Sequence, residues 1–211
     1  MNENVKSRTP ERNEQRRRQI LDAAADCFQR RGFHAASMAE ISKAAGMSVG
    51  HIYHYFANKE AIIRAMVEAR AQEIVEKMDA MRRHPDLPAA MVEKADEGLD
   101  KNLERNSAAL KIEILAEAAR NPAIHETLCA SDRVGMGKLK EILQAAAPAL
   151  AGDPRIVEGR VAIMAALFDG LAIRALLQPD ADRTALLAAL RVAIRALLSE
   201  PAGAPNGRAP R

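Results

Sequence analysis

The chain has 211 residues, 48% hydrophobic and 28% charged, a balance typical of folded globular proteins and not of disordered ones. No apolar run approaches the roughly eighteen residues that span a membrane. The polar, arginine-rich first twenty residues lack the apolar stretch of a secretory signal, so we expect a cytoplasmic protein without a membrane partner. The 31 Lys and Arg residues exceed the 28 Asp and Glu residues by three, and this excess lies entirely in residues 1–60.

The two ends of the chain differ in composition from the region between them. We expect residues 1–10 to form a flexible polar arm and residues 199–211, rich in Pro and Gly, to form a disordered tail. Between these ends, apolar residues recur at helical spacing. A first helix places Ile20 and Phe28 on one face and should end at Gly32.

Two short helices follow, each with a start signal. Ser37-Met38-Ala39-Glu40 is a capping box that opens a second helix, and Gly46 closes it. Ser48 can cap a third helix. Two short capped helices around a tight turn are the pattern of a helix-turn-helix, whose second helix enters the major groove of DNA.

Longer helices fill the rest of the chain. A fourth begins at Asn58 and stops before Pro85, about 35–40 Å of helix that can link two packing units. Pro88, Asn121-Pro122 and Asp153-Pro154 mark later helix starts. No stretch alternates with a period of two residues, so the expected fold is all-α with about nine helices.

The outward face of the third helix carries the candidate DNA contacts. At 100° per residue, Ile52 and Phe56, with Val49 beside them, face inward. The remaining positions offer a glycine, two imidazoles and a phenol, which permit close approach and can bond phosphate oxygens or base edges. Lys59 and the free N–H groups that begin the fourth helix form an anion site suited to a phosphate.

This string resembles the TetR family of bacterial one-component transcriptional regulators over about residues 11–65. The resemblance rests on Gly32-Phe33, residues 37–41 and 44–48, Gly50, residues 52–56 and Asn58-Lys59-Glu60. Ser37, Met47 and Ile52 stand where the family usually has Thr, Val and Leu. Each departure keeps the cap or the apolar packing.

The resemblance implies a domain organisation and a function. Residues 11–57 would form a three-helix DNA-binding domain, and residues 58–198 a helical domain for ligand binding and dimerisation. It implies a repressor that occupies a palindromic operator and is released by a small molecule. The family's DNA contacts fall on Ser37, Ser48, Val49, Gly50, His51, Tyr53, His54 and Lys59.

The resemblance also implies an inducer pocket between residues 62 and 177. Phe168 is the one aromatic residue there, so stacking or cation–π contact with a flat cationic compound is scarce. Methionine suits irregular apolar cavities, and we expect a flexible, largely aliphatic inducer. The expected lining is apolar with two glutamate anchors: Met66, Met78, Met91, Leu103, Leu115, Met136, Met164 and Phe168, with Glu113 and Glu117. Core packing by the methionines and a solvated face for the glutamates are the alternatives.

The eighth and ninth predicted helices, which end at Gln178 and Leu198, carry more apolar surface than one domain face needs. Their larger apolar residues stand among many alanines: Ile163, Leu167, Leu171, Leu187, Leu190, Ile194 and Leu197. Small residues let helices approach closely. We expect a homodimer through these helices, because two-fold symmetry matches a palindromic site.

The sequence offers little support for a function other than DNA binding. It carries no G-x-S-x-G, P-loop or Rossmann glycine pattern, so we expect neither an enzyme nor a cofactor. His51 and His54 lack a third ligand nearby, and Cys27 and Cys129 lack metal-ligand spacing, so no metal is expected. An activator of the same fold, a helical enzyme with scattered catalytic residues and a protein-binding adaptor are the alternatives.

Overall fold

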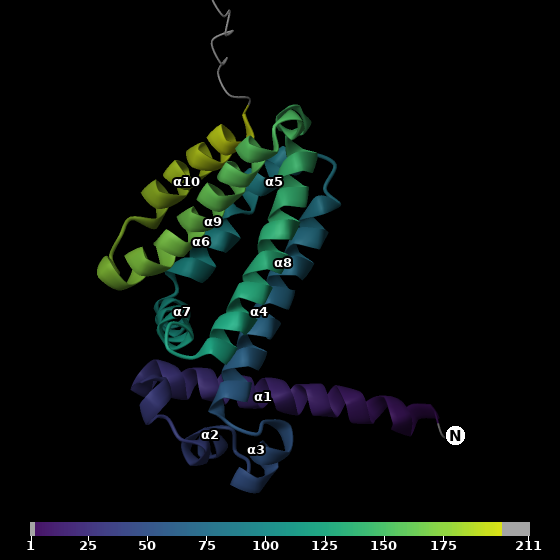
Figure 1. The fold of residues 1–211 in the computed structure, drawn as a ribbon, viewed down its shortest axis with the longest axis vertical. Helices are drawn as coiled ribbons and strands as arrows, with labels where there is room; N and C mark the ends of the chain where they lie inside the picture. The colour runs from purple at the N-terminus through teal and green to yellow at the C-terminus, as the bar shows by residue number, and fades with distance from the viewer. Residues whose placement is uncertain (1–2, 200–211) are drawn as a thin grey trace, which may run out of the picture. The chain divides into compact units, whose positions relative to one another are not determined.

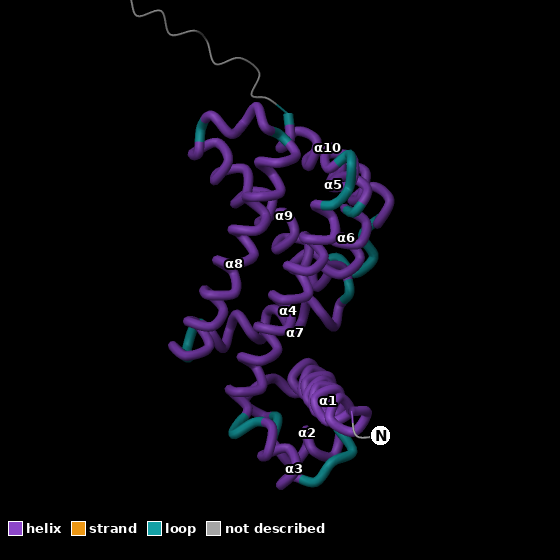
Figure 2. Tube along the Cα trace, turned by 90° about the vertical axis from the view of Figure 1, so that its right-hand side faces the viewer, coloured by secondary structure: helices purple, strands orange, loops and turns teal. Residues whose placement is uncertain are grey.

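The computed structural model describes residues 3–199, which are drawn in Figures 1 and 2. Over this range the chain forms ten α-helices and one short 3-10 helix, with no strand. The all-α prediction is confirmed, with one helix more than expected. The described chain divides into two compact units: residues up to 70 with 109–131, and residues 71–108 with those from 132 onward.

The first unit contains three complete helices and parts of three others. The complete ones are α1 (Glu3–Ala35), α2 (Met38–Ala44) and α3 (Val49–Tyr55). The others, which continue into the second unit, are α4 (Lys59–Arg82), α7 (Arg105–Ala118) and α8 (Pro122–Ala146). Their common core contains fully buried residues from each of the first four helices and from α8: Ile20, Phe28, Ile41, Ile52, Ile62, Ile63 and Ile124.

The predicted start and stop signals are present in this unit. Ser37 and Glu40 form the reciprocal capping box of α2. The Ser48 hydroxyl accepts the His51 N–H at the start of α3. Gly32 interrupts the helix with φ of 76°, and Gly46 follows α2 with φ of 63°. Both angles lie in the left-handed region that glycine adopts at low cost.

The N-terminal segment differs from the prediction. The arm expected over residues 1–10 is helical from Glu3 onward and continuous with α1. The prediction took Pro10 as a helix boundary, whereas a proline removes one hydrogen bond and can bend a helix without ending it. Residues 1–2 and the expected tail beyond Ser199 lie outside the described residues.

The second unit packs short helices against two long ones. Its short helices are α5 (Leu87–Glu93), α6 (Ala95–Leu103) and a 3-10 turn (Pro148–Gly152), and its long ones are α9 (Pro154–Leu177) and α10 (Arg183–Leu198). The single helix expected after Pro88 is divided at Lys94, which ends α5 and precedes α6. α9 packs against α6, and α10 packs against α5, α6 and α9.

A glycine allows α6 to approach α9 closely. A Cβ on Gly98 would lie 2.6 Å from Cε1 of Phe168, so the phenylalanine ring occupies the space that a side chain would fill. Phe168 packs against a core that includes the fully buried Leu99 and Ile142. Between Glu3 and Ser199, no helix has both the length and the apolar character needed to cross a membrane.

Candidate nucleic-acid interface

α3 is held in place by two side chains that point into the first unit. Ile52 is fully buried and Phe56, the residue that ends the helix, is 3% exposed. The guanidinium of Arg17, from α1, lies 4.7 Å from the centre of the Phe56 ring. A seven-residue helix is unstable alone, so these contacts fix its orientation.

The opposite face of α3 is open. Seven of the eight predicted DNA contacts are exposed: Ser37, Ser48, Val49, Gly50, His51, Tyr53 and His54. Val49 is 38% exposed and therefore does not belong to the buried side of the helix, where periodicity placed it. A Cβ on Gly50 would have no neighbour within 4 Å, so the backbone is accessible there.

Tyr55 organises the two imidazoles on this face. Its ring centre lies 5.4 Å from that of His51 and 5.4 Å from that of His54, the second pair edge to face. Its hydroxyl donates a 3.4 Å hydrogen bond to Oδ1 of Asn13 on α1. Sequence reasoning missed Tyr55, although its spacing of four residues from His51 on one helix was a usable signal.

The cap of α2 carries a charge next to this face. The Ser37 N–H and hydroxyl donate to the Glu40 carboxylate at 2.9 and 3.1 Å. These hydrogen bonds, with the positive charges of Arg31 and Lys59, hold the pKa of Glu40 below its usual value. Glu40 therefore stays ionised and keeps the start of α2 fixed.

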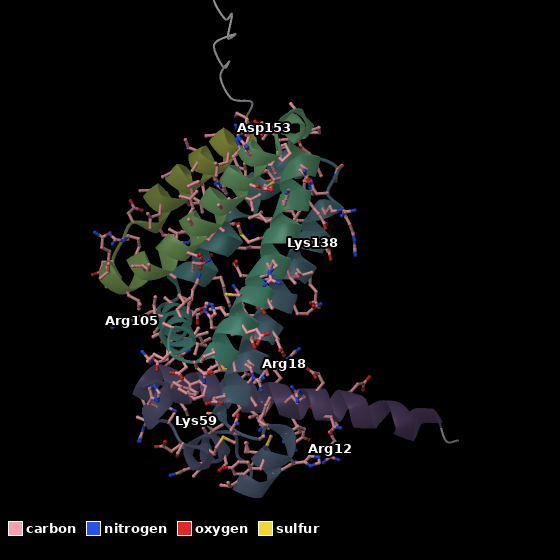
Figure 3. The ribbon with its side chains drawn as sticks, in the orientation of Figure 1. Arg12, Arg18, Lys59, Arg105, Lys138 and Asp153 are labelled. Carbon is pink, nitrogen blue, oxygen red and sulfur yellow. The ribbon has the colours of Figure 1, made fainter. Side chains whose placement is uncertain are left out.

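The Lys59 ammonium binds groups of the protein itself. Its ammonium donates to the carbonyl oxygens of Phe33, His34 and Ala36 at 2.6, 3.1 and 2.6 Å, and it lies 4.7 Å from the centre of the Phe33 ring. An ammonium has three N–H donors, and all three are used here. Figure 3 labels Lys59 where α4 begins. The structure thus gives this side chain an internal role at the end of α1.

The predicted inducer-pocket residues do not form one group. Met66, Glu113, Leu115 and Glu117 belong to the first unit and the other six to the second. The Glu113 carboxylate accepts the Phe33 N–H, and the buried Glu117 carboxylate pairs with His34 and Arg120. The two glutamates therefore bind protein groups in this structure, whereas sequence reasoning took them as ligand anchors.

The six predicted residues of the second unit contribute to its apolar core. Met91 and Met164 are buried, and Met78, Leu103, Met136 and Phe168 pack against the same cluster. The hollow of about 650 Å³ on this unit is lined instead by residues 177–182, Ala185 and Leu186. A second hollow, of about 440 Å³, lies along α1 and the end of α2. Neither contains a predicted lining residue.

The outward faces of α9 and α10 expose large apolar side chains. Ile163, Ile173 and Leu177 on α9 and Val192 on α10 are between 46% and 63% exposed. Leu190, in contrast, is 6% exposed and belongs to the core of the second unit, so it is not part of this surface. Within residues 3–199, no three His, Cys, Asp or Glu side chains gather as a metal site requires.

A short capped helix with an open polar face, backed by α1 and α2, defines a helix-turn-helix protein. Residues 20–66 match the family described as "Bacterial regulatory proteins, tetR family", and residues 89–199 match "BetI-type transcriptional repressor, C-terminal". The chain belongs to the TetR family, with a C-terminal region of the BetI type, and the predicted resemblance is confirmed.

Individual relatives agree with this assignment. The chain is 33% identical to the regulator UidR of Escherichia coli K12 over 112 residues, 51% of this chain and 54% of that protein. It therefore spans about half the length of the curated relatives that it matches. Its fold is similar to that of Salmonella enterica GusR, with a TM-score of 0.70 and 28% identity over 87% of this chain and 95% of that one. Bacillus subtilis FadR, solved with stearoyl-CoA, shares the fold at 19% identity, with a TM-score of 0.69 over 86% and 97% of the two chains.

Proposed function

We propose that this protein is a transcriptional repressor that binds a palindromic DNA operator as a homodimer and is released by a small molecule. The observation that carries the proposal is the exposed face of α3, fixed from behind by Ile52, Phe56 and Arg17. The BetI-type repressor match favours a repressor over an activator. A protein with this function would act in the cytoplasm, where the DNA lies, and by binding rather than by catalysis.

The exposed groups divide by the contacts that their chemistry favours. The imidazoles of His51 and His54 can donate to or accept from base edges in the major groove. The hydroxyls of Ser37, Ser48 and Tyr53 are suited to phosphate oxygens, which fix register and orientation. Val49 and Gly50 let the start of α3 approach the bases. We leave Lys59 out of this set because its ammonium is used by three carbonyl groups.

The homodimer would form through α9 and α10. On α9, exposed apolar or small residues recur three or four positions apart, at Ile163, Ala166, Ile173 and Leu177 with Gly170 between them. Ala185, Ala189, Val192 and Ala196 continue the pattern on α10. Two such faces, one from each copy, can form a four-helix interface. The small residues let the helices of the two copies approach closely, and burial of the exposed branched side chains stabilises the dimer.

We propose an aliphatic inducer that enters the apolar core of the second unit. Its predicted lining there is four methionines, Leu103 and Phe168, side chains that can rearrange around a flexible chain. The stearoyl-CoA bound to FadR, which has the same fold, supports this ligand class. A thermal-shift series with palmitoyl-CoA, choline and a planar dye tests it: palmitoyl-CoA alone should stabilise the protein and release DNA. Binding of the dye alone would contradict an aliphatic ligand.

Selection from a randomised duplex library with the purified protein tests DNA recognition. Two-fold symmetry predicts an enriched palindrome whose half-sites lie about one helical turn, or a multiple of it, apart. A matched pair of variants assigns the surface. Gly50→Asp places a negative charge on the open face of α3 and should abolish binding, whereas Asn106→Asp adds the same charge at an exposed position of α7 and should not. An unenriched library would overturn the proposal.

A further inference from the structure

The chain leaves regular helix at Gly32 and reaches the cap of α2 at Ser37; we call residues 32–36 the α1–α2 junction. α7 holds this junction through a carboxylate. Oε1 of Glu113 accepts a 2.5 Å hydrogen bond from the Phe33 N–H. A Cβ on Gly32 would lie 3.2 Å from the same oxygen. The carboxylate therefore lies directly against the junction backbone, and a side chain at Gly32 would have to displace it by a few tenths of an ångström.

A second carboxylate of α7 binds the next junction residue. Oε2 of Glu117 lies 3.1 Å from Nε2 of His34 and 3.3 Å from a guanidinium nitrogen of Arg120. Glu117 is 4% exposed, whereas the His34 side chain is 71% exposed. A buried carboxylate without partners is strongly unfavourable, so the imidazole and the guanidinium are needed to keep Glu117 in place.

The two glutamates make the position of the junction depend on that of α7. They lie four residues apart and therefore on one face of the helix. A hydrogen bond is lost when donor and acceptor separate by much more than about 3.5 Å, so a small displacement of α7 must either move the junction or break these bonds. α7 begins in the second unit, at Arg105, and ends in the first.

The junction in turn determines where the helix-turn-helix begins. Ser37 follows it directly and caps α2, which packs against α3. Lys59 donates to the carbonyl groups of three junction residues, so the first residue of α4 is bound to the same segment. A change at α7 therefore reaches α2 through a five-residue segment.

We propose that Glu113 and Glu117 are positioning residues through which a displacement of α7 alters the affinity of α3 for DNA. The proposal rests on the proposed function, since it concerns how the same DNA-binding surface is regulated. It concerns α7 specifically, because two carboxylates on one side of this helix bind Phe33 and His34 of the α1–α2 junction.

The sign of the effect separates positioning from simple charge. Loss of a negative charge strengthens binding to a polyanion, so on electrostatics alone Glu113→Ala would bind all DNA more tightly. If Glu113 positions the junction, Glu113→Ala should instead bind the operator more weakly. Glu113→Gln removes the charge as well but keeps a carbonyl oxygen that can accept the Phe33 N–H.

The experiment measures the ratio of affinities for the selected duplex and a scrambled duplex by fluorescence anisotropy, in the full-length protein. Glu113→Ala should lower this ratio about tenfold, the equivalent of one hydrogen bond to a charged group, and Glu113→Gln should restore most of it. His34→Ala, at an exposed position, should lower the ratio without unfolding the protein. Glu126→Ala removes an exposed glutamate from α8 and serves as the control for charge.

Amide hydrogen exchange at Phe33 provides the second readout. Its N–H should be protected in the wild type and in Glu113→Gln and should exchange rapidly in Glu113→Ala. If Glu113→Ala does not fold, two other results still test the proposal. Rapid exchange of the Phe33 N–H in the wild type would overturn it. An affinity ratio in His34→Ala equal to that of the wild type would overturn it as well. A folded Glu113→Ala protein with the wild-type ratio also overturns it. Failure of the wild type to distinguish the two duplexes would instead refute the proposed function.

Discussion

The ammonium of Lys59 donates a 2.6 Å hydrogen bond to the carbonyl oxygen of Ala36, the residue directly before the cap of α2. Together with its bonds to Phe33 and His34, this contact neutralises the carbonyl end of α1. A lysine whose position in the sequence indicates a phosphate contact thus stabilises the domain from within.

Lys59→Met should lower the free energy of unfolding by about 2–3 kcal/mol, the scale of hydrogen bonds made by a charged donor. Its affinity for DNA should fall, but the slope of log K against log salt should stay at the wild-type value. A lysine that contacts phosphate would instead reduce the slope by about one. Lys43→Met, at an exposed position on α2, is the matched control for stability. A shallower slope with unchanged stability would restore the phosphate role.

Two substitutions on α3 should separate base recognition from phosphate contact. His51→Ala should cost about 1–3 kcal/mol of discrimination at one base pair of each half-site. Tyr53→Phe removes only a hydroxyl and should weaken binding to the operator and to scrambled DNA by the same factor. Titrations of each variant against single-base variants of the selected duplex measure both effects. Equal losses on all duplexes for His51→Ala would contradict a base contact.

Val192→Glu should produce a folded monomer. Val192 is 63% exposed on α10, so a glutamate there is tolerated in the monomer but would be buried in the proposed interface. Sedimentation velocity at micromolar concentration measures the association, and circular dichroism measures the fold. Leu190→Glu, in the core of the second unit, should unfold the protein instead. A wild-type monomer, or a Val192→Glu dimer, would contradict the assigned surface.

The pair Asp100–Arg183 should make stability depend on acid pH. Two hydrogen bonds of 2.6 and 2.8 Å join these side chains and link α6 to α10. The guanidinium holds the pKa of Asp100 below its ordinary value of 3.8. Because the folded-state pKa is the lower one, the pair stabilises the fold above the unfolded pKa and loses this effect as pH falls through the folded value.

Thermal unfolding of Asp100→Asn between about pH 6 and pH 3 checks this sign. Asp100→Asn should be less stable than the wild type near pH 6. The difference in stability between the two proteins should disappear as the pH falls toward about 3. Asp180→Asn, in the exposed loop before α10, controls for the loss of one negative charge. A difference that is constant across the range would contradict a contribution from the ionised pair.

Local signals predicted much of the first unit. The capping box at Ser37, the cap at Ser48 and the left-handed turn at Gly32 each depend on residues within a few positions of one another, so the sequence contains them fully. Helical periodicity likewise identified Ile52 and Phe56 as the buried side of α3. Val49 was wrongly placed on the buried side of α3. Helical periodicity gives the direction in which the first residue of a helix points, but not whether other residues cover it.

Long-range partners could not be predicted in the same way. Glu113 binds a backbone N–H eighty residues away, and Lys59 binds carbonyl groups more than twenty residues away. Both are charged residues of the kind usually found at the surface, and only the fold shows that they bind backbone groups of the same segment, residues 32–36. The burial of Leu190 and the exposure of Val192 depend in the same way on how α10 packs against α5, α6 and α9.

Dimethyl sulfate protection on the selected duplex tests the central claim, that the open face of α3 enters the major groove. The reagent methylates guanine N7, which lies in that groove. The wild type should protect guanines in two half-sites about one helical turn, or a multiple of it, apart, and Gly50→Asp should protect none. A tightly bound duplex with every guanine N7 still reactive would contradict the account.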